Sequence, residues 1–311
     1  MTDGDREDKP NRDESEHKRN PNLNSRSRSD SNSNSNSNST SVPSVFDRLP
    51  RLERRLTSAD TEQMLLCLDF DGTLAPHVDD PDSAELTTAN RRVLETLASQ
   101  PAVDIAVISG RALDDVRTRV GMDGLTYAGN HGLEYETGSS SVHTPAERYR
   151  STIQTICEEL EARLDETDCT VENKGITATV HYRNADDTAE EIENWLTSLI
   201  EDTIEETTDE HLRITSGTDI VEIRPAIDWN KGHAVQQFEE QCPDDCISVY
   251  LGDDTTDEDA FRAIAPDGIG IHVGTNSDTA ADYRVSSVDE VTSFLDWIAE
   301  TGTDALKDDS Q

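Results

Sequence analysis

The sequence predicts an α/β protein in which a parallel β-sheet core is interrupted by a smaller α+β domain. Short apolar runs alternate with segments of helical periodicity towards both ends of the folded region. This alternation is typical of a parallel sheet with helices on both faces. The middle of the chain reads instead as helix, hairpin, helix, hairpin, which is typical of an antiparallel α+β unit inserted into the parallel one.

The first part of the predicted core begins with the run MLLCLDF at residues 64–70. This run is short and apolar and is followed by Asp-Gly, which indicates a buried strand that ends in a loop. Residues 86–100 have helical spacing, and VDIAVIS at 103–109 predicts a second buried strand. A helix at 112–121 and a short strand within 124–132 complete this part.

The inserted unit is predicted from two helices, at 145–165 and 186–206, and two hairpins. The segment 169–183 contains two strand-like stretches around a Lys-Gly turn, and the segment 212–225 turns at Gly217. After this unit the α/β alternation returns, with helices at 231–241, 256–265 and 288–300 and strands at 247–251 and 269–273.

These patterns divide the chain into five segments. Residues 1–45 include the polar repeat SRSRSDSNSNSNSNSTS, which has almost nothing to bury and predicts a disordered tail. We assign residues 46–137 and 226–300 to the two parts of the core, 138–225 to the insertion and 301–311 to an acidic tail.

The composition limits the partners and the environment of the protein. Its 311 residues include 66 Asp plus Glu and 27 Lys plus Arg, a formal net charge of −39. This charge disfavours nucleic acid and anionic membranes as partners, because both attract basic surfaces. Acidic residues spread along the whole chain favour a halophilic protein, since concentrated salt screens their repulsion. No apolar run is long enough for a membrane span, and the N-terminus lacks a secretory signal, so we expect a cytoplasmic location.

Two carboxylates follow the first predicted strand directly, in the string Asp69-Phe70-Asp71-Gly72-Thr73. Ligands of open parallel sheets bind beyond the carboxyl ends of the strands, which is where these side chains fall. Two acids this close do not both stay ionised easily without a cation. The string therefore predicts a site for a metal such as Mg²⁺, which prefers oxygen ligands and substrate phosphate.

Three further strand or helix ends carry residues suited to the same site. Ser109 and Arg111 follow the second strand, where a hydroxyl and free N–H groups can bind a phosphate oxygen. Lys231 opens a helix and supplies one positive charge, and Asp253 and Asp254 follow a later strand. The acids at 257 and 258 fit either this site or a capping box for the next helix.

In this order, the four elements resemble the haloacid dehalogenase superfamily of aspartate-nucleophile phosphatases. Within it the chain is similar to the trehalose-6-phosphate phosphatases, in the strings GNHGLE, ENKGITATVHYR, VEIRPAIDWNKG and LGDDTTDEDAF. The similarity runs from about residue 62 to residue 298. It implies a Rossmann-like core with an inserted cap of the C2 type, and hydrolysis of trehalose 6-phosphate to trehalose and phosphate as the last step of trehalose synthesis.

The resemblance also implies roles for individual residues. Asp69 would attack phosphorus to give an aspartyl-phosphate, and Asp71 would protonate the leaving oxygen and then activate water. Ser109 and Lys231 would hold the transferring phosphoryl group, which makes four catalytic residues. The implied Mg²⁺ ligands are Asp69, Asp71 through its backbone carbonyl, Asp253 and Asp254. The implied substrate contacts are Gly72, Ser109, Gly110, Arg111, His131, Glu172, Lys174, Glu222 and Arg224.

Two other functions are compatible with the same residues. A related capped phosphatase would act on sucrose-phosphate or a mannosyl-phosphoglycerate, and a non-catalytic protein would only sense a sugar phosphate. The presence of Asp69, Asp71, Lys231 and Asp253 together disfavours the sensor, because loss of any one would be its simplest sign. We expect a monomer whose partner is a small sugar phosphate.

Overall fold

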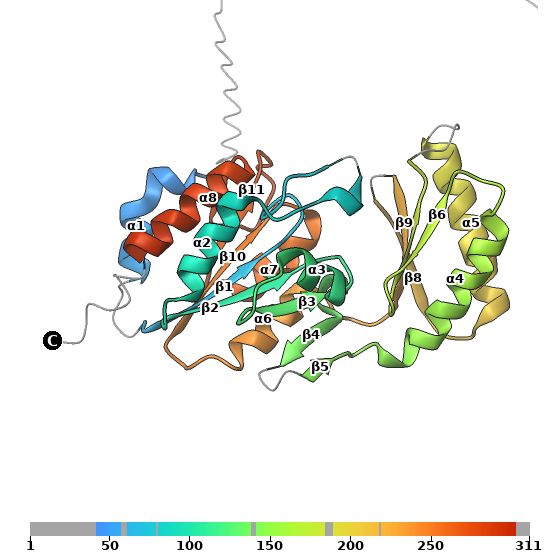
Figure 1. Cartoon of the computed structure of the whole chain (residues 1–311), viewed down its shortest axis with the longest axis horizontal. Coiled ribbons are helices and arrows are strands. Elements are labelled where there is room, and N and C mark those ends of the chain that lie inside the picture. Colours follow the sequence, from blue (N-terminus) through green and yellow to red (C-terminus); the bar gives the residue numbers. More distant parts are fainter. Residues whose placement is uncertain are drawn as a thin grey trace, which may run out of the picture. The chain divides into compact units, whose positions relative to one another are not determined.

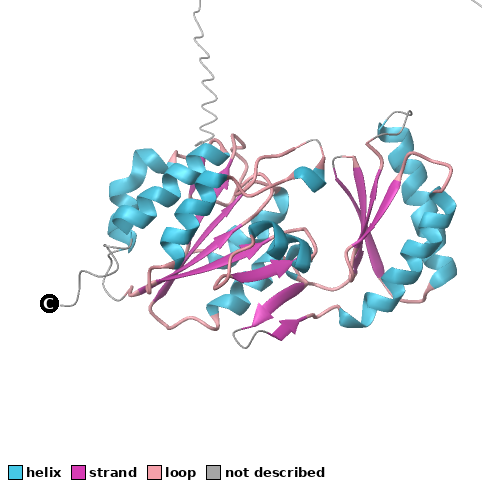
Figure 2. Ribbon diagram, viewed as in Figure 1, coloured by secondary structure: helices cyan, strands magenta, loops and turns pink. Residues whose placement is uncertain are grey.

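The computed structural model describes residues 42–56, 61–78, 80–137, 141–183, 189–217 and 219–302. These residues form two separate sheets, seen in Figures 1 and 2. The larger sheet has the strand order β12-β11-β10-β1-β2-β3-β4-β5, and its first six strands are parallel. Its strands are β1 (Gln63–Leu68), β2 (Val103–Ile108), β3 (Thr126–Gly129), β4 (Glu134–Thr137), β5 (Ser141–His143), β10 (Cys246–Gly252), β11 (Ile269–Val273) and β12 (Tyr283–Val285).

Helices cover both faces of the larger sheet, which explains the unbroken apolar run of β1. Leu66 and Leu68 enter a core shared with one group of helices, whereas Leu65 and Cys67 enter a second core on the opposite face. A strand buried on both faces needs apolar residues at every position. The first core contains residues of α1 (Leu49–Leu56), α2 (Thr88–Ala98), α3 (Leu113–Val120) and α8 (Val288–Trp297), and the second contains residues of α6 (Lys231–Glu239) and α7 (Glu258–Ile264).

The smaller sheet is antiparallel throughout, with the order β6-β7-β9-β8. Side chains alternate between its faces, so that Ala178, Val180 and Val221 pack on the two long helices of this unit. The opposite face is polar and carries Glu172 and Glu222. The elements are α4 (Arg150–Leu164), β6 (Thr170–Asn173), β7 (Ala178–His181), α5 (Ala189–Thr207), β8 (Leu212–Gly217) and β9 (Ile220–Pro225).

The predicted fold class is confirmed. The structure differs from the prediction in the short strands at the edges of the larger sheet and in the bounds of two predicted segments. Strands β4, β5 and β12 were not predicted, because each is only three or four residues long and gives a weak periodic signal. β5 pairs with β4 of the larger sheet, so the smaller sheet begins well after residue 138. Residues 42–45 already belong to the packed chain, because Arg284 donates its backbone N–H to the Pro43 carbonyl and Val45 is buried.

Several predictions concern residues outside the described ranges. The tail predicted at 1–45 lies outside them up to residue 41, and the tail at 301–311 lies outside them after residue 302. The domain boundaries at 138 and 225 stay predictions. Within the residues that are described, no helix is both long enough and apolar enough to cross a membrane.

Burial on α5 leads to a test of the packing of the smaller unit. Leu196 is fully buried against the sheet, whereas its larger neighbour Trp195 is 43% exposed. We expect Leu196→Ala to lower the free energy of unfolding by about 2–5 kcal/mol, because it leaves a cavity. Trp195→Ala is the matched control and should cost about 1 kcal/mol or less. Urea unfolding measures both values, and a larger loss for Trp195→Ala would contradict this packing.

Candidate active site

The turn after β1 brings the first aspartate to the edge of the sheet. Asp69 donates its backbone N–H to the Leu251 carbonyl of β10 at 2.9 Å, which joins the two strand ends. Gly72 has a φ of +79°, a left-handed conformation that favours glycine. A Cβ atom at Gly72 would also lie 2.2 Å from Oδ2 of Asp253. The glycine therefore serves both the turn and the close approach of β10.

Lys231 is held between two carboxylates at the same edge. Asn230 caps α6 and accepts the backbone N–H of His233, which sets Lys231 as the first residue of the helix. Its Nζ donates to Oδ1 of Asp69 and to Oδ1 of Asp257, each at 2.7 Å. The lysine side chain is 3% exposed, and a buried ammonium is tolerated only when it is paired in this way.

Asp69, Asp253 and Asp257 form a cluster of acids around this lysine. One oxygen from each lies within 4.8 Å of the others. Burial raises the pKa of Asp69 well above its ordinary value, and Asp257 and Asp253 add to the rise against the opposing effect of Lys231. Burial and Asp257 likewise raise the pKa of Asp253. A divalent cation with a preference for oxygen fits these residues, because three carboxylates outnumber one ammonium by two charges.

Asp254 and Asp257 lie in other places than the sequence predicts. Asp257, rather than Asp254, belongs to the acid cluster. Asp254 is exposed and accepts the backbone N–H of Thr255, so it caps the following helical turn and lies outside the cluster. Asp257 closes the same capping box through the N–H of Asp254 and at the same time contacts Lys231. Asp257 therefore belongs both to the capping box and to the acid cluster. The sequence pattern of a capping box gives no sign of the second role.

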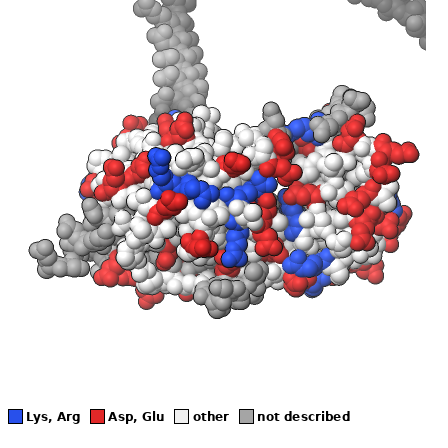
Figure 3. Space-filling model, viewed as in Figure 1, with Lys and Arg blue, Asp and Glu red and all other residues white. Residues whose placement is uncertain are grey.

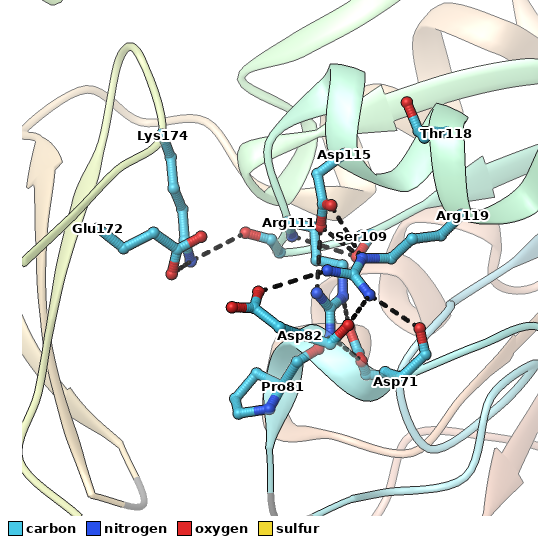
Figure 4. A network of polar contacts seen from close by, with 12 residues as sticks. Asp71, Pro81, Asp82, Ser109, Arg111, Asp115, Thr118, Arg119, Glu172 and Lys174 are labelled. Atoms are coloured by element: carbon cyan, nitrogen blue, oxygen red, sulfur yellow. Dashed lines mark hydrogen bonds and ion pairs between the residues drawn. The ribbon is translucent and has the colours of Figure 1, made fainter. Parts of the chain in front are cut away.

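Arg111 is committed to Asp71, as Figure 4 shows. Its Nε and Nη2 donate to the two carboxylate oxygens of Asp71 at 2.8 and 2.7 Å, in the bidentate geometry that is strong for this pair. Nη1 donates to Asp115, and Nη2 also donates to the Pro81 carbonyl. The backbone N–H of Arg111 donates to Oγ of the buried Ser109. Asp71 and Ser109 are thereby connected by one residue.

A second arginine extends this network to the loop that follows the first strand. Arg119 donates Nε to Asp115 at 2.8 Å (Figure 4), and its Nη1 donates to the carbonyls of Asp82 and Ala84. Arg111 and Arg119 both donate to Oδ2 of Asp115 on α3. The network therefore fixes the loop at 80–84 relative to the helix that follows Arg111.

The polar face of the smaller sheet supplies the other predicted substrate residues. Lys174 donates Nζ to the Gly110 carbonyl at 3.4 Å and lies 3.9 Å from Glu222. It also lies 4.0 Å from Glu172, beside which Figure 4 shows it. Arg224 lies 3.7 Å from Glu222. Alternating cations and carboxylates of this kind suit a ligand with many hydroxyl groups.

His131 lies between the two sheets in a strained turn. Asn130 and His131 have φ values of 51° and 56°, which residues other than glycine rarely adopt. Asn130 holds this conformation by donating to Glu134 and to the Lys174 carbonyl and by accepting from Thr177. His131 places Nε2 at 3.5 Å from Glu222, and its buried Nδ1 has no hydrogen-bond partner among the residues that the structure describes.

The structure thus brings the predicted residues together in two groups. Asp69, Lys231 and Asp253 meet at the strand ends, while Glu172, Lys174, Glu222, Arg224 and His131 meet at the polar face of the smaller sheet. Asp71 and Arg111 pair beside Ser109. Sequence reasoning missed His77, whose Nε2 lies 2.7 Å from Oδ2 of Asp253, because a lone exposed histidine in a loop carries no pattern.

In this fold an aspartate pair follows the central strand of a parallel sheet, and a second α+β unit lies between the two parts of that sheet. A solved haloacid dehalogenase-like hydrolase from Bacteroides thetaiotaomicron shares the fold, with a TM-score of 0.52 at 15% identity over 76% of this chain and 99% of that one. The solved C-terminal domain of C. albicans trehalose-6-phosphate phosphatase shares this fold, with a TM-score of 0.64 at 24% identity over 83% of this chain and 98% of that one. The sequence model of the trehalose-phosphatase family matches residues 67–289. The chain therefore belongs to the trehalose-phosphatase family.

Curated relatives agree with this family. The chain is 36% identical over 244 residues to the trehalose-phosphate phosphatase of Mycobacterium marinum, covering 74% of this chain and 60% of that protein. It is 33% identical over 284 residues to the probable trehalose-phosphate phosphatase H of Arabidopsis thaliana, covering 84% of this chain and 78% of that protein. The match thus leaves about two fifths of the mycobacterial relative uncovered.

Glu222 makes the stability of the fold depend on pH. Burial would raise its pKa, but His131, Lys174 and Arg224 outweigh burial and lower the pKa from 4.5 to about 2. Because burial lowers the pKa of His131, the two other cations supply the charge near neutral pH. A carboxylate with a lowered pKa stabilises the fold above its unfolded pKa, and this stabilisation is lost as the pH falls from 4.5 towards 2.

We expect about 3 kcal/mol of unfolding free energy to depend on the ionisation of Glu222. Glu222→Gln should therefore lose stability at pH 7 and show a flatter profile below pH 5 than the wild type does. Urea unfolding at constant salt between pH 7 and pH 3 measures this, with the exposed Glu166→Gln as the control. Parallel profiles for the wild type and Glu222→Gln would exclude this origin of the acid sensitivity.

Proposed function

We propose that this protein is a Mg²⁺-dependent phosphatase that hydrolyses trehalose 6-phosphate to trehalose and phosphate, the last step of trehalose synthesis. Membership of the trehalose-phosphatase family supports the activity. The observation that carries the proposal is the buried Lys231 bridge, which holds Asp69 against an acid cluster at the carboxyl ends of β1 and β10. A carboxylate nucleophile, a fixed cation and oxygen ligands in one place suit phosphoryl transfer.

In the proposed reaction, an Asp69 oxygen attacks phosphorus and the bond from phosphorus to the sugar oxygen breaks, which leaves an aspartyl-phosphate. Asp71 gives a proton to the departing sugar oxygen and then takes one from the water that cleaves the aspartyl-phosphate. Arg111 donates to both oxygens of Asp71 and orients this carboxylate beside Ser109. Lys231 and Ser109 bind the oxygens of the phosphoryl group.

The proposed metal ligands are carboxylates of Asp69 and Asp253 and the backbone carbonyl of Asp71. When bound, Mg²⁺ would offset the excess negative charge of the cluster and of the substrate phosphate. Asp257 belongs to the same cluster and is a further candidate ligand, whereas the exposed position of Asp254 suits a contact through water.

The unit at 138–225 is the proposed cap, and its polar face would bind the sugar. Glu172, Lys174, Glu222 and Arg224 would bond hydroxyl groups of the trehalose part, and His131 would shape the turn beneath them. Gly72, Gly110 and Arg111 line the opposite side of the site, next to Asp71 and Ser109. Charged groups of this kind reject ligands that lack the matching hydroxyl groups.

We further propose a halophilic and cytoplasmic protein that works as a monomer, and the acidic surface supports the halophilic part. Figure 3 shows Asp and Glu side chains distributed widely over the visible face, with fewer Lys and Arg. Together with 66 acidic and 27 basic residues, this suits concentrated salt, where the repulsion is screened.

The direct test is the release of phosphate from a panel of sugar phosphates. We expect trehalose 6-phosphate to have the highest kcat/KM, because the cap presents charges for a substrate with many hydroxyl groups. The panel includes sucrose-phosphate, mannosyl-phosphoglycerate and glucose 6-phosphate, each with Mg²⁺ and with EDTA. A higher kcat/KM for another sugar phosphate would identify that compound as the substrate instead. Activity that persists in EDTA would exclude Mg²⁺ as a required cofactor.

The two lysines of the described residues give a second test. Lys231→Ala should lower kcat by about 10²-fold for every phosphomonoester, because Lys231 contacts the proposed nucleophile. Lys174→Ala should lower turnover of trehalose 6-phosphate by about 10–100-fold and spare p-nitrophenyl phosphate, which does not fill the cap. Steady-state kinetics of both variants on both substrates measure this, with circular dichroism as the folding control. Equal losses on both substrates for Lys174→Ala would contradict a specificity cap.

A further inference from the structure

Tyr250 lies on β10, three residues before Asp253, and has no exposed surface. Its hydroxyl donates to Oδ1 of Asp257 at 2.6 Å. That oxygen is the one that Nζ of Lys231 contacts at 2.7 Å, and Lys231 in turn contacts Asp69 at 2.7 Å. Tyr250 is therefore the far end of a buried chain of hydrogen bonds that leads to the proposed nucleophile.

The bonds to Asp257 show why the hydroxyl matters. Asp257 is fully buried, and its two oxygens accept from Tyr250, Lys231 and the backbone N–H of Asp254. The backbone donor fixes Oδ2, while Lys231 and Tyr250 share Oδ1. Without the phenol, Oδ1 would keep a single donor on a flexible side chain, and a buried carboxylate that loses a donor rearranges towards the donors that remain.

The ring of Tyr250 has a separate role in packing. It meets the ring of Phe261 edge to face at 5.5 Å between centroids, in the core between the larger sheet and α7. Phenylalanine at this position would keep that contact, because only the oxygen is removed. The structure thus separates the packing of the ring from the hydrogen bond of the hydroxyl.

We propose that Tyr250 is a positioning residue for the phosphatase reaction: its hydroxyl orients Asp257, which holds the Lys231 ammonium against Asp69. This inference rests on the proposed phosphatase function, and it assigns Tyr250 no contact with substrate. Residues that orient the groups of a metal or catalytic site typically change activity by about 10–100-fold when they are removed.

The experiment compares Tyr250→Phe with Tyr127→Phe. Tyr127 is a buried tyrosine of β3, 1% exposed, whose hydroxyl donates to the Met122 carbonyl at 2.7 Å rather than to any residue of the site. Both variants remove one tyrosine hydroxyl that has a partner, and urea unfolding of both measures the loss of stability separately from the loss of activity. Kinetics are measured with trehalose 6-phosphate and with p-nitrophenyl phosphate, and binding of orthovanadate is measured by titration calorimetry in Mg²⁺.

We expect Tyr250→Phe to lower kcat by about tenfold on both substrates and to weaken orthovanadate by a similar factor, with KM nearly unchanged. Tyr127→Phe should match the wild type in all three quantities. The proposal is overturned if Tyr250→Phe keeps the wild-type kcat and orthovanadate affinity, or if Tyr127→Phe loses as much as Tyr250→Phe does.

The same measurements separate this inference from the proposed function. If the wild type hydrolyses p-nitrophenyl phosphate but not trehalose 6-phosphate, the substrate is wrong, and the comparison of the two tyrosines stands on the aryl phosphate. If the wild type hydrolyses neither, orthovanadate affinity decides between the two variants. If the wild type also fails to bind orthovanadate, no phosphoryl site lies beside Lys231, and the proposed role of Tyr250 is excluded.

Discussion

The contact of the Lys231 ammonium with Asp69 and Asp257 is the interaction on which the rest of the site depends. Each partner comes from a different element: the loop after β1, the start of α6 and the turn after β10. Because the ammonium is buried, moving these elements apart would leave a charge without its partner. An unpaired charge in a protein interior strongly lowers the stability of the fold. The close approach also explains Gly252, where a Cβ atom would lie 2.2 Å from Cγ of Asp257.

Weaker contacts join the polar face of the smaller sheet to the core. Lys174 reaches the Gly110 carbonyl at 3.4 Å, and His131 reaches Glu222 at 3.5 Å. These distances are longer than those around Lys231, and the participating side chains are partly exposed. Asn130 joins the same two parts by shorter bonds, at 2.7 Å from Thr177 and 3.1 Å from the Lys174 carbonyl, so the charged side chains of the polar face are held less tightly than the chain that carries them.

The parts of the site that could be predicted are those set by topology. Asp69 and Asp253 follow strands, and the carboxyl ends of neighbouring parallel strands meet at one edge, so their proximity follows from the order of apolar runs. Asp257 and Asp254 could not be separated in this way, because both fit a capping pattern and only burial distinguishes them. The pairing of Arg111 with Asp71 was also beyond prediction, since a long side chain reaches several partners from one backbone position. Short strands such as β12 were missed because three residues contain too little periodicity.

The balance of charges within the fold agrees with the arrangement of the site. The chain has five lysines against 66 acidic residues, and only Lys174 and Lys231 lie among the described residues. Their side chains are 12% and 3% exposed, so neither contributes much to the surface.

Lysine carries a compact charge with three donors, whereas the guanidinium of arginine is planar and wider. A gap in which one nitrogen lies 2.7 Å from oxygens of both Asp69 and Asp257 suits the ammonium. At Asp71, where two oxygens accept from two nitrogens, the residue is an arginine. The choice between the two cations thus follows the geometry of the acid that each one meets.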